Sequence, residues 1–140
     1  MEQTRDRLVL TTDRARIDVD AVLAMLVASH WGGSMTRLVL ERAIENSLCF
    51  GVYDGKRQVG FARAVTDLTT YAYLTDVIVA DDMRGRGIGS WMVEAILAHP
   101  ELQGLRRIAL WSRDAPWLYA RYGFTEDLPG SHYMELRAKR

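Results

Sequence analysis

Three glycines on alternate positions, with arginines beside them, stand out in residues 81–91, DDMRGRGIGSW. Glycine removes the side chain where another group must approach the backbone closely, and it also permits positive φ. The two arginines add positive charge at the same point of the chain. Glycines and arginines in this order indicate a binding site for an anion such as a phosphate, provided that the flanking elements can position these residues.

The flanking sequence supports such a site, because a strand is predicted before the glycines and a helix after them. Residues Tyr71 to Ala80 are rich in β-branched and aromatic side chains, which are typical of a strand. The apolar residues that follow the glycines have the spacing of one helix face: Ile88, Trp91, Met92, Ala95 and Ile96. A helix N-terminus carries unpaired N–H groups and partial positive charge, so loop and helix together predict a phosphate cradle. The alternative is a plain surface turn, which three alternating glycines at the start of a helix disfavour.

Two common phosphate-binding motifs fit this segment poorly. The P-loop needs a lysine followed by serine or threonine, and that pair is absent. The dinucleotide pattern G-x-G-x-x-G needs a glycine where Ser90 stands, and it normally opens a larger nucleotide-binding fold. A nucleotide-binding fragment therefore stays as a minor alternative.

A third pattern fits well, and it points to a family. Residues Arg84 to Gly89 match R-x-x-G-x-G, and the sequence here resembles the acyl-CoA pyrophosphate loop of the GCN5-related N-acetyltransferase (GNAT) family. Leu74 to Val79 (LTDVIV) is similar to the family's fourth strand, and Trp117 to Phe124 (WLYARYGF) is similar to its FYxxxGF element. The resemblance covers roughly residues 8–138. It implies the acyl-CoA N-acyltransferase fold, an α+β (mixed α/β) domain with a central mixed, mostly antiparallel sheet flanked by helices.

The resemblance also implies an activity and a co-substrate. The activity is transfer of an acetyl group from acetyl-CoA to a primary amine by direct attack on the thioester, with no metal. The backbone of Val77, Ile78 and Val79 would bind the pantetheine arm as an added strand, and an N–H near Val77 would stabilise the developing oxyanion. The pyrophosphate would be held by Arg84, Gly85, Arg86, Gly87, Ile88, Gly89 and Ser90. Because a fold alone does not establish activity, a non-catalytic acyl-CoA sensor is the alternative.

Two residues are candidates for moving protons. Tyr119 matches the family tyrosine that protonates the departing thiolate, and its ordinary pKa of roughly 10 keeps it protonated at neutral pH. By periodicity alone Tyr119 would be a core aromatic, since it shares a helical face with Ala115 and Tyr122. Asp76 interrupts an apolar strand, on the same predicted face as Leu74 and Ile78, and can be the base for the amine. It can equally be a structural hydrogen-bond acceptor.

The acceptor amine is the least specified part of the reaction. His30 and Trp31, after the first helix, are the candidate substrate residues, although a histidine on an apolar stripe is more often a core residue. Tyr73 and Trp111 can join Trp31 in an aromatic wall for a small amine, or can be core. Where many relatives have asparagine before the last helix this chain has Asp114, which keeps a capping role but cannot donate as an amide.

The remaining elements follow from hydrophobic spacing, turn residues and caps. We expect a first helix after Asp18, a second from Thr36 to Asn46, and a helix end at His99. A short helix should begin at Asp114, with Pro116 in its first turn, and stop near Gly123. Further strands are expected at Leu8 to Thr11, Leu48 to Tyr53, Arg57 to Thr66, Arg106 to Trp111 and His132 to Ala138, with a hairpin turn at Asp54-Gly55.

Composition limits the class of protein. A chain of 140 residues with 49% hydrophobic residues is expected to be a single globular domain, residues 1–140. A formal net charge of +0 argues against a general nucleic-acid binder and gives little support to a polyamine-like acceptor. The chain has no signal-peptide core or membrane-length apolar run, and Cys49 is its single cysteine. We therefore expect a cytoplasmic protein, with Cys49 as a small buried strand residue and not an acyl carrier, and a homodimer as a possible assembly.

Overall fold

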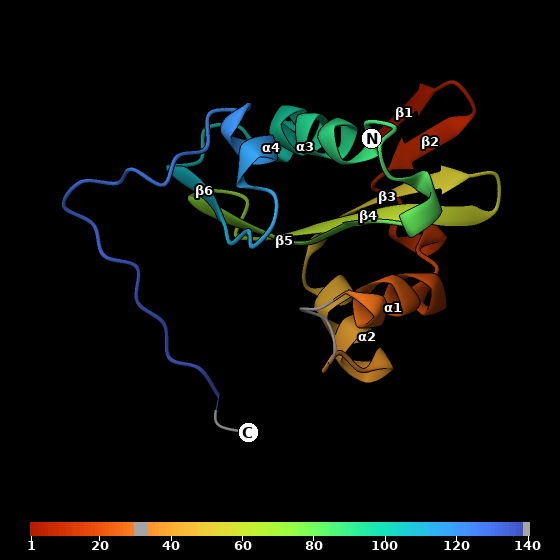
Figure 1. Cartoon of the computed structure of the whole chain (residues 1–140), viewed down its shortest axis with the longest axis horizontal. Helices are drawn as coiled ribbons and strands as arrows, with labels where there is room; N and C mark the ends of the chain where they lie inside the picture. Colours follow the sequence, from red (N-terminus) through yellow and green to blue (C-terminus); the bar gives the residue numbers. More distant parts are fainter. Residues whose placement is uncertain (30–33, 139–140) are drawn as a thin grey trace.

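The computed structural model describes residues 1–29 and 34–138, which form a mixed sheet with helices on both faces. Helices α3 and α4 cover one face of the sheet, and α1 and α2 cover the other (Figure 1). The strands are β1 (Glu2–Arg5), β2 (Leu8–Thr11), β3 (Leu48–Asp54), β4 (Arg57–Thr66), β5 (Tyr71–Val79) and β6 (Arg107–Leu110). The helices are α1 (Val19–Ala28), α2 (Arg37–Glu45), α3 (Ile88–Ala98) and α4 (Pro116–Ala120), with short 3₁₀ turns at Arg14–Arg16, Asp81–Met83 and Pro100–Leu102. This architecture confirms the predicted fold class.

The sheet is antiparallel from β1 to β5 and becomes parallel only where β6 joins β5. The parallel pairing runs from Tyr71 opposite Arg107 to Leu74 opposite Leu110. There it ends, although β5 continues to Val79. The far half of β5 therefore has β4 on one side and no strand of the described chain on the other. The two strands diverge at this point and leave one edge of β5 open.

A β-bulge lies in β5 where this open edge begins. Phe61 pairs with Ile78 and Arg63 pairs with Thr75, so Ala62 alone faces both Asp76 and Val77. Asp76 has a φ of 54°, in the left-handed region that few non-glycine residues adopt. A bulge bends its strand and changes the direction of the side chains that follow. Leu74 consequently packs in the α3-side core while Ile78 packs in the α1/α2-side core, so the prediction that Asp76 shares one face with both was wrong.

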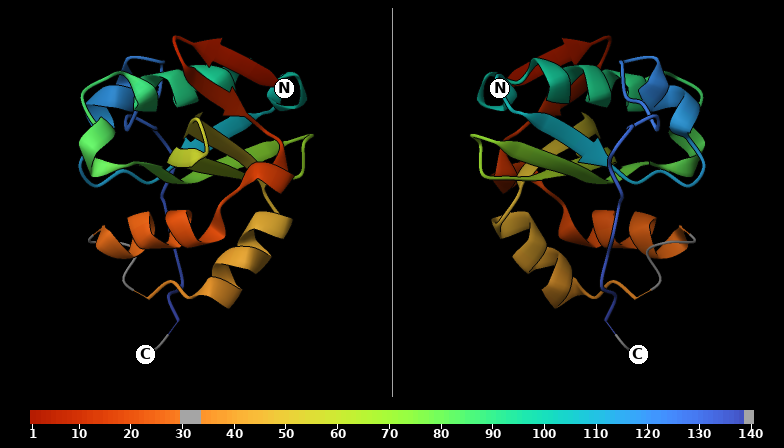
Figure 2. Two further views of the ribbon diagram at one scale, coloured as in Figure 1. Left: turned by 90° about the vertical axis from the view of Figure 1, so that its right-hand side faces the viewer. Right: turned by 90° about the vertical axis from the view of Figure 1, so that its left-hand side faces the viewer.

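The apolar side chains form two cores, one on each face of the sheet. The α3-side core contains Trp91 and Met92 from α3 against Phe50 and Leu74 of the sheet. The α1/α2-side core contains Val22, Leu26, Leu40 and Ile44 against Phe61, Cys49 and Ile78. Figure 2 shows the sheet between these two helical layers. The site described below lies at the end of this sandwich, where β5 leaves β6.

The predicted caps and turns are largely confirmed. The Asp18 side chain accepts a hydrogen bond from Ala21 N at the start of α1, and Thr36 accepts from Val39 N at the start of α2. His99 is the C-cap of α3, and its Nδ1 also accepts from Glu101 N. The β3–β4 hairpin turns at Asp54-Gly55, where Gly55 has a φ of 60°.

Three local predictions differ from the structure. Strand β1 was not predicted, because its residues are charged and exposed and carry no apolar alternation. Asp114 does not cap α4; the N-cap is Ala115, which makes no side-chain capping bond. Residues His132 to Ala138 are extended but belong to no sheet in the chain, so the predicted last strand is wrong for this structure.

Candidate acyl-CoA site

The glycine segment turns the chain from the end of β5 into α3. After the 3₁₀ turn Asp81–Met83, Gly85 and Gly87 both adopt positive φ, 77° and 78°. Gly87 is the N-cap of α3 in the left-handed conformation, and it makes no side-chain capping bond because it has no side chain. A residue with a Cβ would be strained at either position. The conformation explains why glycine is needed at these two positions.

This turn leaves a row of backbone N–H groups without acceptors in the described part of the chain. The first bond of α3 is donated by Trp91 N to Gly87 O at 3.0 Å, so Ile88, Gly89 and Ser90 have no intrahelical acceptor. Gly85, Arg86 and Gly87 likewise donate no backbone hydrogen bond to a described residue. Six consecutive N–H groups are thus available at the positive end of a helix. Such an arrangement can bind an anion without any side chain.

The charged side chains around the turn are mostly paired with one another. Arg84 pairs with Asp81 at 3.1 Å, its Nε donates to Val79 O at 3.5 Å, and its own N–H donates to Asp81 O. Asp82 accepts two bonds from Arg57, at 2.6 and 2.8 Å, and the pKa of Asp82 is lowered chiefly by that contact. Asp81 and Asp82 are therefore each paired with an arginine. Arg86 is left with no ion-pair partner among the described residues, so it is the arginine free to meet an anion.

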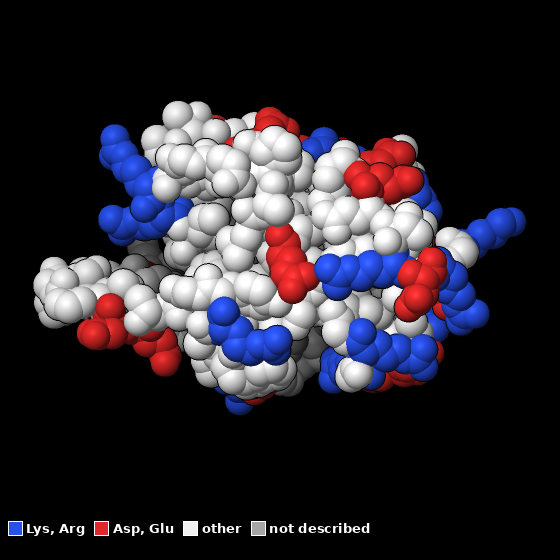
Figure 3. Space-filling view, turned by 90° about the horizontal axis from the view of Figure 1, so that it is seen from above, with Lys and Arg blue, Asp and Glu red and all other residues white. Residues whose placement is uncertain are grey.

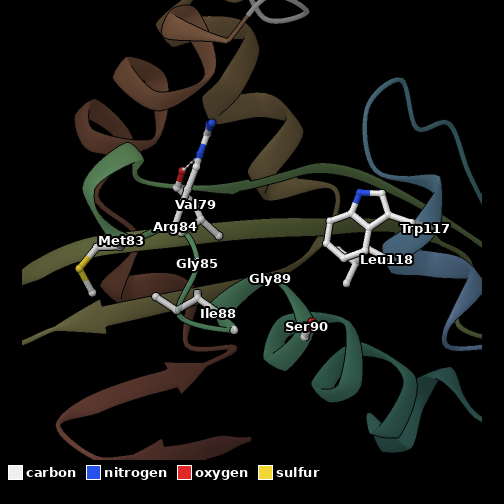
Figure 4. A pocket seen from close by; sticks show the side chains of 10 residues that line it. Val79, Met83, Arg84, Gly85, Ile88, Gly89, Ser90, Trp117 and Leu118 are labelled. Carbon is white, nitrogen blue, oxygen red and sulfur yellow. Dashed lines mark hydrogen bonds between the residues drawn. The ribbon is translucent and has the colours of Figure 1, made fainter.

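A cavity of about 180 Å³ opens beside these N–H groups. Its walls are the end of β5, the glycine turn, the first turn of α3 and the start of α4, and Figure 4 shows Trp117 and Leu118 of α4 facing that turn. The lining residues are Val79, Met83, Arg84, Gly85, Gly87, Ile88, Gly89, Ser90, Trp117 and Leu118. The cavity is lined by Val79 of β5 and by six of the seven residues predicted for the pyrophosphate, all except Arg86. Met83, Trp117 and Leu118 also line it, and the sequence analysis gave none of these three a role in the site. The sequence could have indicated Trp117, because it begins the WLYARYGF segment that contains Tyr119.

A second hollow, of about 310 Å³, lies on the other side of the end of β5. It is bordered by α1 residues, among them Met25 and Ala28, and by Val79 to Asp82. Val79 belongs to the walls of both hollows. The open edge of β5 therefore lies between a space on the α3/α4 face and a space on the α1 face.

Asp76 is held by an arginine of the neighbouring strand. Arg63 Nε donates to the Asp76 carboxylate at 2.6 Å, and Arg63 Nη1 donates to Ser47 Oγ at 3.2 Å. The two charged side chains are only 8% and 16% exposed. Because Arg63 and Ser47 lie on the α1/α2 face, the bulge directs Asp76 toward that face. The structural role of Asp76 as a hydrogen-bond acceptor is thus visible in the structure.

Tyr119 lies on the opposite face, in α4. Its side chain is buried, and its ring meets Phe124 edge to face with centroids 5.9 Å apart. Burial raises the pKa of the Tyr119 hydroxyl above its ordinary value, which keeps it protonated. The hydroxyl makes no hydrogen bond to a described residue. Tyr119 does not line the 180 Å³ cavity, but its two preceding neighbours do.

The remaining candidates lie elsewhere or outside the described residues. His30 and Trp31 fall in the undescribed segment 30–33. Trp111 is not a core residue, since it is 61% exposed, and its one aromatic partner among the described residues is Tyr133, with centroids 5.1 Å apart. Cys49 is buried as expected, and burial raises the pKa of its thiol to about 11, which makes it a poor nucleophile.

The surface over α3 and α4 carries charges of both signs. Figure 3 shows lysine and arginine side chains interspersed with aspartate and glutamate side chains on this face. Within the described ranges, no helix is both long and apolar enough to cross a bilayer. In the same ranges, no three His, Cys, Asp or Glu side chains gather into a metal site.

Comparison with known proteins identifies relatives of this arrangement. Residues 45–126 match the model of the acetyltransferase (GNAT) domain. The chain is 32% identical to a candidate acetyltransferase of Gibberella zeae, over 84% of this chain and 78% of that protein. It is 40% identical to a crystal structure of a candidate GNAT acetyltransferase from Xanthomonas campestris, with a TM-score of 0.90 over 96% of both chains. A Clostridium acetobutylicum structure determined with acetyl-CoA shares the fold, with 15% identity, a TM-score of 0.69, and coverage of 93% of this chain and 96% of that one.

Proposed function

Because the chain belongs to the GNAT family of acetyltransferases, we propose that it transfers an acetyl group from acetyl-CoA to a primary amine of a small acceptor. The observation that carries the donor is the row of six unpaired N–H groups beside the open edge of β5. Acetyl-CoA supplies the activated acetyl thioester. The GNAT-fold structure with acetyl-CoA supports the same donor for this chain.

The donor would be held by backbone groups along the turn and the strand. The N–H groups of Gly85 to Ser90 would bind the pyrophosphate, with Arg86 adding charge. The open edge of Val77, Ile78 and Val79 would bind the pantetheine amides as a further strand binds a sheet edge. Arg84 would act differently from its neighbours. It holds the end of β5 and the turn together, since its N–H and guanidinium are already bonded to Asp81 and Val79.

The bulge supports a role for the Val77 amide. A bulge turns one peptide unit out of the regular ladder, and strained backbone of this kind gathers at functional sites. The residue before Val77 has that conformation, and β5 is open on the cleft side at this point. We therefore assign the Val77 N–H to the thioester oxygen, where a fixed donor stabilises developing negative charge.

The proton transfers would use groups on opposite faces of the sheet. Asp76, on the α1/α2 face, would accept a proton from the amine, directly or through water. Tyr119, on the α3/α4 face, would donate a proton to the departing thiolate, and its raised pKa ensures that the proton is present. The β5–β6 pairing ends at Leu74, and the gap beyond it connects the two faces of the sheet. An amine on the α1/α2 face could therefore reach a thioester bound along β5, and the tetrahedral intermediate would collapse with departure of the thiolate on the Tyr119 side.

The acceptor would approach from the α1/α2 face. His30 and Trp31, which follow α1, are the proposed acceptor residues. The balanced composition of the chain, with 18 lysine and arginine and 18 aspartate and glutamate residues, gives little support to a strongly basic or acidic macromolecular acceptor, so a small amine is the proposed class. The hollow bordered by α1 offers space on this face beside the end of β5.

The experiment that tests this function measures donor binding and turnover separately. Calorimetry should show acetyl-CoA binding, and release of the CoA thiol should accelerate with at least one amine of a broad panel. Mass spectrometry of a metabolite extract incubated with enzyme and acetyl-CoA should identify the acetylated acceptor. Binding without turnover on any amine would make the protein an acyl-CoA-binding module. Stabilisation by NAD or ATP, with none by acetyl-CoA, would overturn the donor assignment.

A further inference from the structure

Two aspartates stand directly before the turn that is proposed to bind the pyrophosphate. Asp81 and Asp82 begin a short 3₁₀ turn, and the unpaired N–H groups of Gly85 to Ser90 follow it. Negative charge beside an anion site opposes binding, because like charges repel. It also competes for Arg86, the arginine of this turn that has no ion-pair partner among the described residues. Binding of an anion here is therefore favoured when other groups hold both aspartates.

The two aspartates are held by arginines from different parts of the chain. Asp81 pairs at 3.1 Å with Arg84, which follows it in the same turn. Asp82 instead accepts two hydrogen bonds from Arg57, at the start of β4, at distances of 2.6 and 2.8 Å. Each Nη atom of Arg57 meets a different carboxylate oxygen, which is the bidentate geometry that fixes an arginine–carboxylate pair. Asp82 is thus held by an arginine that does not line the 180 Å³ cavity.

Arg57 and Arg86 both act on the Asp82 carboxylate. The pKa of Asp82 is lowered first by its hydrogen bonds with Arg57 and, to a smaller extent, by the charge of Arg86. Arg86 is therefore close enough to attract Asp82, and it would compete for Asp82 if Arg57 were removed. Asp54, the other carboxylate that acts on Arg57, is itself paired with Arg7 at 3.0 Å. Arg57 is consequently available to Asp82 alone.

The turn has backbone and core contacts that do not involve the Arg57–Asp82 pair. Ala80 N donates to Val59 O at 2.8 Å, and Met83 N donates to Ala80 O at 2.9 Å. The Met83 side chain is buried in the α3-side core. The ion pair, by contrast, is exposed, with the two side chains 53% and 62% accessible. Exposed ion pairs contribute little to stability, so the pair is better explained by the charge that it compensates.

We propose that Arg57 is a positioning residue of the donor site: it holds Asp82 and thereby leaves Arg86 free to bind the pyrophosphate. This inference rests on the proposed function, because it concerns the same bound acetyl-CoA. Arg57 acts without touching the donor. Removing its side chain leaves an uncompensated negative charge beside the turn and gives Arg86 a competing partner. Both effects weaken the binding of acetyl-CoA, and both disappear when Asp82 loses its charge.

Calorimetric titration of acetyl-CoA into single and double variants tests this role. R57M should raise the Kd about three- to tenfold, between the effect of an exposed ion pair and that of a hydrogen bond to a charged group. The rise should shrink at high ionic strength, because exposed charges are screened. R37M is the matched control: Arg37 is also 53% exposed and pairs with Glu41 of α2, so this variant should bind as wild type. D82N should bind at least as tightly as wild type, and R57M/D82N should recover the affinity that R57M loses.

The double variants distinguish this role from two others. R57M/R86M should bind no more weakly than R86M, because Arg57 acts through Arg86; if the two effects multiply, Arg57 meets the donor itself and the proposal is wrong. If D82N binds as weakly as R57M, the ion pair serves to hold the turn in shape, and charge compensation is wrong. A folded R57M whose Kd lies within about twofold of wild type would also overturn the proposal. A wild-type protein that does not bind acetyl-CoA would overturn the proposed function, and this inference with it.

Discussion

The variant Gly89→Ala is expected to weaken acetyl-CoA binding without destabilising the folded protein. Gly89 is the second residue of α3 and lines the 180 Å³ cavity. Unlike Gly85 and Gly87, it does not have positive φ. A Cβ built on Gly89 meets only Leu118 Cδ2, at 3.8 Å, which is ordinary van der Waals contact. Nothing in the free protein therefore requires glycine at this position, whereas an anion bound to the neighbouring N–H groups does.

We expect G89A to stabilise the fold and to weaken the binding of acetyl-CoA. Alanine in a helix is favoured over glycine by about 0.5–1 kcal/mol, which should raise the melting temperature by about 1–4 °C. The added methyl group should keep the pyrophosphate from at least one N–H donor. A hydrogen bond to a charged group contributes about 1.5–3 kcal/mol, so the Kd for acetyl-CoA should rise about 10–150-fold.

Calorimetric titration of acetyl-CoA and thermal unfolding provide the two readouts. G55A is the matched control, because Gly55 has a φ of 60° in a remote hairpin and no atom within 4 Å of a built Cβ. That variant should lose about 1–2 kcal/mol of stability to backbone strain and keep the wild-type Kd. If G89A is folded and binds acetyl-CoA within about threefold of wild type, the N–H groups of this turn do not bind the pyrophosphate.

Three further changes test the proton carriers and the buried thiol. Y119F should keep the packing on Phe124 and the Kd for acetyl-CoA. It should lower kcat by about 10²–10⁴-fold in chemistry-limited assays. A wild-type kcat in this variant would mean that Tyr119 has only a structural role. D76N should lower kcat similarly and recover part of it with a small added base such as imidazole; loss of stability with unchanged kcat would mean that Asp76 only binds Arg63. Because burial raises the pKa of Cys49 from 9.0 to about 11, its contribution to stability is complete below pH 9 and is lost as the pH rises toward 11. The urea midpoint of C49A should therefore fall less over that range than that of wild type, and equal slopes would contradict this origin.

The parts of the fold that the sequence predicted are those determined locally. Asp18 and Thr36 were recognisable as caps because a short polar side chain before an apolar stripe satisfies unpaired N–H groups by itself. The glycine turn was recognisable for a related reason. Gly87 has a positive φ, and glycine is the residue type that adopts positive φ without steric cost. The hypothesis of an anion-binding site at the start of a helix rests on such local features.

The features that were missed depend on partners distant in the sequence. Strand β1 is polar, and its place is determined by pairing with β2 and by Trp91 Nε1, which donates to Gln3 at 2.8 Å across 88 positions. Residues 131–138 have the alternation of a strand, but within the described part of the chain they pair with no strand of the sheet. The periodicity of apolar residues indicates whether a segment is a helix or a strand, but it does not indicate which other element the segment packs against or pairs with.

The most consequential miss is the bulge at Asp76, because it changes what the catalytic hypothesis requires. Without the bulge Asp76 would share a face with Leu74, among the apolar side chains under α3. With it, the carboxylate pairs with Arg63 on the face that the acceptor would approach. Arg63 fixes the position of this carboxylate, so in the proposed reaction the amine would be deprotonated by an Asp76 that Arg63 orients. Replacing Arg63 with methionine should then impair turnover as well as stability, because the proton acceptor loses the contact that orients it.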